Sequence, residues 1–183
     1  MKSILFVILC FLLLLSGCKK KESENDMGSK KEELIAKILQ QPYGKEVLPK
    51  VGTVEEFVED TSNPTPLPVV SLEDFFEGNE DLGSIGCNLI EHPGIDTFYE
   101  VLREIRQRPD VQDVLVAISQ IDEYLDWPFS ESLYIITSCS KERITEWVKP
   151  LQPDEIGEGW SGGRPPEAPE PKEGYKVYWV WWD

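Results

Sequence analysis

The chain has 183 residues, with 18 Lys and Arg against 34 Asp and Glu and a single His, which gives a formal net charge of −16. A surface this acidic excludes nucleic acid as a partner, because phosphates require a basic surface, and it suits solubility or a basic protein partner. The length is enough for one domain with a real core and too short for two comfortable ones.

The N-terminus has the composition of a leader. Lys2 is followed by twelve uninterrupted apolar residues, Ile4 to Leu15, and then by two small residues. A bilayer-spanning helix needs about 20 apolar residues, whereas the core of a signal peptide needs roughly 7–15. We therefore predict that residues 1–17 are a signal peptide.

The stretch Leu15-Ser16-Gly17-Cys18 resembles the lipobox of bacterial lipoproteins. The resemblance implies that Cys18 is lipidated and becomes the first residue of the mature protein. It also implies a lipid anchor in the cell envelope, on the periplasmic face of the outer membrane in a Gram-negative cell or the outer face of the plasma membrane in a Gram-positive one. An ordinary secretory signal or an N-terminal membrane anchor, with Cys18 incidental, is the alternative.

The residues that follow Cys18 are polar. Residues 18–29 have no apolar period, so we predict a lipidated, flexible tether. Its lysines at positions 19–21 are suited to anionic lipid head groups. Loss of residues 1–17 removes Lys2 and no acid, so the net charge of −16 becomes −17. Residues 30–183 are predicted to form a single domain.

Capping signals precede short apolar stretches in the first half of this domain. Ser29 and Glu32 form an S-x-x-E capping box, and Thr53 and Glu56 repeat it. The predicted elements are a helix over Lys30 to Gln40, a capped segment over Thr53 to Val58, an extended stretch over Thr61 to Pro68 and a helical turn over Ser71 to Glu77, which Ser71 caps and Gly78 ends.

From Gly83 the apolar pattern becomes more regular. It predicts a strand over Ser84 to Ile90, a helix over Ile95 to Gln107, strands over Val111 to Ile121 and Ser132 to Cys139, a helix capped by Ser140, and a strand over Tyr175 to Trp182. The order βαββαβ is that of the split-βαβ plait. We therefore predict an α+β fold with a ferredoxin-like antiparallel sheet over about 83–183, helices on one face and an N-terminal helical extension.

Two of the four cysteines remain for the domain. Cys10 leaves with the signal peptide and Cys18 carries lipid, which leaves Cys87 and Cys139 in a compartment that permits disulfides. The predicted plait places them on neighbouring central strands. A bridge between them and a pair of buried free thiols are both open at this point.

The body of the chain resembles an uncharacterised bacterial domain family with a loose similarity to immunity proteins encoded beside secreted toxins. The resemblance covers roughly residues 68–183 and brings no catalytic residue. The stretches that carry it are Val70-Ser71-Leu72-Glu73-Asp74-Phe75-Phe76-Glu77-Gly78-Asn79, Gly83-Ser84-Ile85-Gly86-Cys87-Asn88, His92-Pro93-Gly94, Leu151-Gln152-Pro153-Asp154 and Trp181-Trp182-Asp183.

His92 is the one candidate for acid–base chemistry. It lies between the carboxylates Glu91 and Asp96, where an imidazole could serve as a general base or a metal ligand. A capping or surface role in a turn is the alternative, and we favour it. The acidic cluster Glu77 to Asp81 lacks the spacing of a calcium loop, and no zinc-like clustering of Cys and His occurs, so neither a metal nor a cofactor is predicted.

Two features suggest a binding surface. Residues 152–174 contain five prolines and five glycines, and here Trp160 and Arg164 are candidates to anchor a partner, although Trp160 packing the loop down is an equal alternative. The last strand is apolar on both faces and is expected at a sheet edge. One alternative is that the segment from Leu34 to Val58 covers the second face of this strand. The other is that the aromatic residues of the strand bind a partner; these are Tyr178, Trp179, Trp181 and Trp182.

These features predict a membrane-anchored lipoprotein whose domain binds a protein partner, with a basic partner and an immunity-type role against a toxin both compatible with the pattern. The alternative is an envelope hydrolase that uses His92 and nearby carboxylates. Binding is favoured because no nucleophile, base and orienting group recur at a recognisable spacing.

Overall fold

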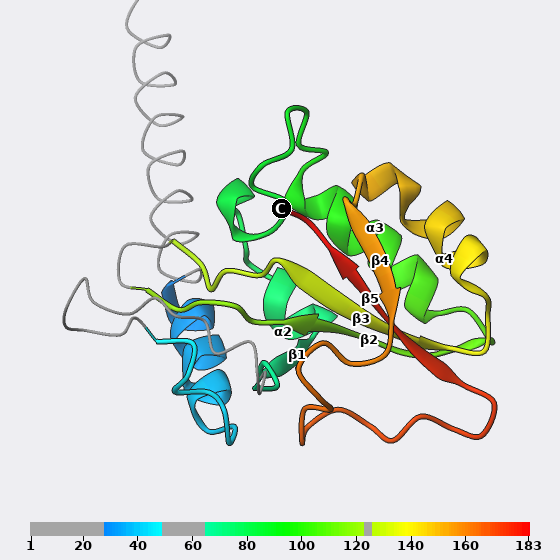
Figure 1. Cartoon of the computed structure of the whole chain (residues 1–183). Coiled ribbons are helices and arrows are strands. Elements are labelled where there is room, and N and C mark those ends of the chain that lie inside the picture. Colours follow the sequence, from blue (N-terminus) through cyan, green and yellow to red (C-terminus); the bar gives the residue numbers. More distant parts are fainter. Residues whose placement is uncertain (1–27, 49–64, 123–125) are drawn as a thin grey trace, which may run out of the picture.

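The computed structural model describes residues 28–48, 65–122 and 126–183. Its centre is a five-stranded antiparallel sheet in the order β1-β2-β3-β5-β4 (Figure 1). The strands are β1 (Val69–Ser71), β2 (Val111–Ala117), β3 (Ser132–Thr137), β4 (Glu155–Glu158) and β5 (Lys176–Trp181). The α+β class is therefore confirmed.

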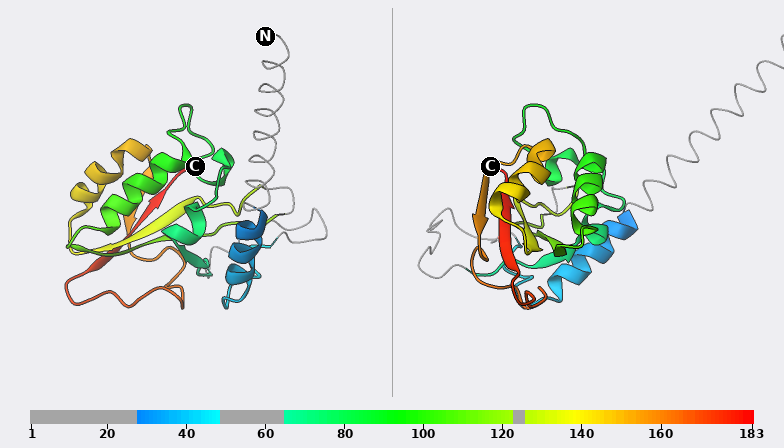
Figure 2. Two further views of the ribbon diagram at one scale, coloured as in Figure 1. Left: turned by 180° about the vertical axis from the view of Figure 1, so that it is seen from behind. Right: turned by 90° about the vertical axis from the view of Figure 1, so that its right-hand side faces the viewer.

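The helices gather on one face of this sheet. α3 (Ile95–Arg106) and α4 (Lys141–Val148) lie side by side across it, and α2 (Leu72–Phe76) follows β1 directly (Figures 1 and 2). Short 3-10 turns occupy Leu82–Ser84 and Lys149–Leu151, and residues 28–39 form a further helix. Within the described ranges, no helix is long and apolar enough to cross a membrane.

The helices form where the apolar period predicted them. α3 buries four apolar residues at helical spacing, Ile95, Phe98, Leu102 and Ile105. The helix over 28–39 buries Leu34 and Ile38 in the same way. Ser71 caps α2 as predicted, because its hydroxyl accepts the amide N–H of Asp74 at 3.1 Å.

The sheet has a packed core on each face. The inner core, between sheet and helices, includes Tyr178, Val180 and Trp182 of β5. The smaller outer core includes Val177 of β5 and Tyr134 of β3, and residues of the 159–175 loop cover part of it. Because successive strand residues face opposite sides, Trp179 and Trp181 lie on the outer face with Val177.

The strand predicted over Ser84 to Ile90 is wrong. This stretch forms turns, and its one pairing is an isolated bridge between Ile85 and Ser130. Gly86 adopts φ +62°, a left-handed conformation that turns the chain out of any strand. The first strand is instead Val69–Ser71, directly after the stretch predicted to be extended.

The ferredoxin-like strand order is not confirmed. β5 pairs with β3, in the place that the plait gives to the missing strand. Nor is β5 an edge strand, because β4 pairs along its other side. β4 was not predicted: it is a four-residue strand, Glu-Ile-Gly-Glu, inside a loop rich in proline and glycine, and its local sequence has low β-propensity.

Of the two alternatives left open for Cys87 and Cys139, the structure shows free thiols and no bridge, and neither thiol is fully buried. Cys87 is exposed two residues after Ile85, which pairs with Ser130, whereas Cys139 lies beyond the other end of β3. The nine residue steps from Ser130 to Cys139 span roughly 30 Å when extended. The thiol of Cys139 donates to a carboxylate oxygen of Asp110 at 2.9 Å.

Some predictions lie outside the described residues. These are the signal peptide, Cys18 and nearly all of the tether, together with the capped segment over Thr53 to Val58.

Candidate functional site

His92 is built into the loop that leads to α3. Its Nδ1 accepts the backbone N–H of Gly94 at 2.9 Å, so the neutral ring carries its proton on Nε2, which lies 2.8 Å from the carbonyl oxygen of Ile85 and donates to it. The ring also stacks on Phe98 with centroids 5.3 Å apart. Both nitrogens are therefore engaged in holding the loop, and neither is directed at a substrate.

The long loop after β4 is fastened to the outer face of the sheet. Trp160 packs edge-on against Tyr134, with centroids 4.7 Å apart, and the Tyr134 hydroxyl bonds to Ser161. Arg164 donates to the carbonyl oxygen of Ala168 and pairs with Glu170. Trp160 and Arg164 therefore hold the loop in place, and burial raises the pKa of the Tyr134 phenol beneath it.

The aromatic residues of the last strand divide between the two faces. Tyr178 and Trp182 are core residues, 3% and 1% exposed, and the indole Nε1 of Trp182 donates to the carbonyl oxygen of Leu151 at 2.7 Å. Trp179 and Trp181 are partly exposed on the outer face. Only these two of the four predicted aromatics are available to a partner.

The described part of the N-terminal segment does not cover this face. Leu34, Ile38 and Val47 belong to the inner core, and Gln41 exchanges two hydrogen bonds with the backbone of Val69 at the other end of the sheet.

Trp179 owes its position to a glycine on the neighbouring strand. Gly157 is its partner in the β4–β5 register, and a Cβ at position 157 would fall within 2.5 Å of the indole Nε1 and closer still to Cε2 and Cζ2. The ring therefore lies across the backbone of β4, and only a residue without a side chain leaves room for it.

Beside the two indoles the outer face is hollowed. We call this the tryptophan hollow; its volume is about 410 Å³. Its lining consists of Leu67, Ser119, Glu131, Ser132, Glu155, Ser161, Trp179 and Trp181. The loop covers the outer core as far as Ser161, and the hollow begins where that cover ends.

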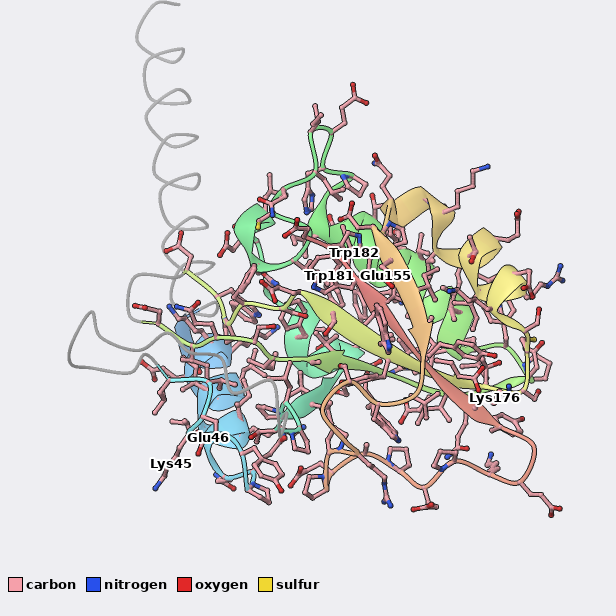
Figure 3. The ribbon with its side chains drawn as sticks, viewed as in Figure 1. Lys45, Glu46, Glu155, Lys176, Trp181 and Trp182 are labelled. Atoms are coloured by element: carbon pink, nitrogen blue, oxygen red, sulfur yellow. The ribbon has the colours of Figure 1, made fainter. Side chains whose placement is uncertain are left out.

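The hollow combines aromatic, hydroxyl and carboxylate groups, and none of its described lining residues is basic. Glu155 is opposite Trp181 in the register of β4 and β5, and Figure 3 shows these two side chains on adjacent strands. Glu155 is exposed, and within the described part of the chain it has no ion-pair partner. In the same described ranges, no three His, Cys, Asp or Glu side chains converge on a possible metal site.

Sequence reasoning identified Trp179 and Trp181 but missed Glu155 and Gly157. Both lie on β4, which contributes them to the outer face, and β4 itself was not predicted. The alternation of Glu155, Ile156 and Gly157, with only Ile156 buried, is the one signal that could have revealed it.

The geometry defines a class of protein: an α+β domain with no assembled catalytic constellation in the described chain, and with an open aromatic hollow on one sheet face. The chain belongs to the uncharacterized protein YfbO family, whose model matches residues 29–180. It is similar to the uncharacterized protein YfbO of Escherichia coli strain K12, with 44% identity over 126 residues, which cover 68% of this chain and 89% of that protein. No solved structure matches the chain.

Proposed function

We propose that this protein is a lipid-anchored protein of the bacterial cell envelope whose domain binds a protein partner through the tryptophan hollow. The observation that carries the binding role is the partial exposure of Trp179 and Trp181 beside a hollow of about 410 Å³. Tryptophan is enriched at binding hot spots, where a rigid ring inserts against the partner. The geometry of His92 gives no comparable support to an envelope hydrolase.

The binding role is tested by site-specific photocrosslinking in cells. A photoreactive phenylalanine analogue at position 181 should give one discrete adduct, whose partner mass spectrometry identifies. The matched control carries the analogue in place of Glu100, which is exposed on α3 and so on the other side of the sheet. No adduct at position 181, or the same adducts from both positions, would exclude the hollow as the binding surface.

The envelope location rests on the lipobox-like stretch that ends at Cys18. A clickable fatty-acid label should be incorporated by the native protein and not by the Cys18→Ser variant, which should also leave the membrane fraction. An intact Met1, or an unmodified Cys18 on membrane-bound protein, contradicts lipidation.

The partner class that we propose is a secreted toxin, which the protein neutralises as an immunity protein does. The support is the resemblance carried by residues 68–183 and the strongly acidic charge. Expression of genes adjacent to this one should be toxic in cells that lack the protein, and the native protein should relieve the toxicity while Trp181→Ala should not. If no adjacent gene is toxic, the immunity role is refuted, whereas the binding surface is still tested by the crosslink from position 181.

A further inference from the structure

The tryptophan hollow has the chemistry of a cation site. Its walls are the indoles of Trp179 and Trp181, and the carboxylate of Glu155 lies across the strand pair from Trp181. Trp179 packs closely on Gly157, and its side chain remains partly exposed. The face of an indole attracts cations through its quadrupole.

The charges around the hollow favour the same class of ligand. Glu131 and Glu155 line it, and none of the described residues that line it is Lys or Arg. Glu155 also lines a neighbouring hollow with Lys141 of α4 and Lys149 of the turn after it. On the last strand and the loop, the cations are already engaged: Lys176 pairs with Glu158 at 3.0 Å, and Arg164 pairs with Glu170. Lys176 is also five residues from Trp181 on β5, roughly 17 Å away (Figure 3).

Other ligand classes fit this chemistry less well. An anion would meet the carboxylate of Glu155, which has no ion-pair partner among the described residues. A purely apolar side chain would pack on the indoles but would remove water from Glu155 without replacing its hydrogen bonds, which is unfavourable. A guanidinium or ammonium group on an apolar stem both packs on the indoles and replaces the hydrogen bonds of Glu155. The stem and the charged group stack on the rings, while the N–H groups donate to the carboxylate.

We propose that the tryptophan hollow receives an arginine or lysine side chain of the partner protein, held between the indoles of Trp179 and Trp181 and the carboxylate of Glu155. This inference rests on the proposed binding function and specifies its chemistry. The volume of about 410 Å³ is near the lower end of the roughly 300–1,000 Å³ that ligand pockets occupy, which suits a side chain.

The test uses the purified full-length protein and two peptides whose termini are blocked and uncharged. One is acetyl-Gly-Gly-Arg-Gly-Gly-amide. In the other, citrulline replaces arginine, so that the side chain has the same shape without the charge. Binding is followed by the indole N–H resonances in NMR spectra, with those of Trp179 and Trp181 assigned from single Trp→Phe variants. The arginine peptide should shift these two resonances and bind at least threefold more tightly than the citrulline peptide.

Two variants, each of which removes one negative charge, test whether the carboxylate of Glu155 is the one that binds the arginine side chain. Glu155→Gln should reduce the affinity for the arginine peptide to that for the citrulline peptide. Glu100→Gln, on the helical side of the sheet, should leave it unchanged. Melting temperatures equal to that of the native protein confirm that both variants are folded.

Equal binding of the two peptides, no shift at Trp179 and Trp181, or equal effects of the two variants would overturn the inference. If this happens while the position-181 crosslink to the partner persists, cation recognition fails and the binding function remains. If the crosslink is also absent, the proposed function fails with it.

Discussion

Replacing Gly157 by alanine tests the contact that shapes the tryptophan hollow. The added Cβ would fall within 2.5 Å of the Trp179 indole, far inside van der Waals contact, so either the ring or the β4 backbone must move. Overpacking of this kind costs about 1–3 kcal/mol. For a protein of this length each kcal/mol lowers the melting temperature by roughly 2–4 °C, so we expect Gly157→Ala to lower it by roughly 2–12 °C.

The assay is thermal unfolding by circular dichroism, combined with the chemical shift of the Trp179 indole N–H. The control is Gly28→Ala in the first described helix, where an added Cβ meets nothing within 4 Å and the melting temperature should be unchanged or slightly higher. If Gly157→Ala changed neither the melting temperature nor the Trp179 resonance, the close packing of the indole on Gly157 would be refuted.

Four further substitutions separate structural from surface roles. His92→Ala removes two hydrogen bonds and should lower the free energy of unfolding by about 1–3 kcal/mol in denaturant titrations, and no loss would disprove the loop-fastening role. Trp182→Ala should cost about 3–5 kcal/mol and Trp181→Ala less than about 1 kcal/mol, so equal costs would contradict their assignment to opposite faces. Arg106 lowers the pKa of Glu73 through a two-pronged hydrogen-bonded pair, so the stabilisation is present above about pH 4.5 and lost as the pH falls through the folded-state pKa. Because the pair is partly exposed to solvent, Glu73→Gln should cost at most about 1 kcal/mol at pH 7 and nothing once the pH is well below the folded-state pKa of Glu73, and a pH-independent cost would rule out this ion pair as its source.

What the sequence determined by itself was the set of locally encoded elements. The apolar period of α3 and the Ser71 cap of α2 fix helices through neighbours no more than four residues apart, and the apolar runs that became β2, β3 and β5 were long enough to identify. Large apolar side chains on both faces of the last strand also indicated that one of these faces was either covered by another segment or bound to a partner.

Only the tertiary structure decided which strands pair and which face is open. β4 is too short to be a strand alone and gains its hydrogen bonds from β5, about twenty residues later, so no local pattern specifies it. That pairing places Gly157 under Trp179 and Glu155 opposite Trp181. The same loop that contains β4 then returns over part of the outer face, and this non-local packing leaves the tryptophan hollow open within the described residues, while Trp182 is buried.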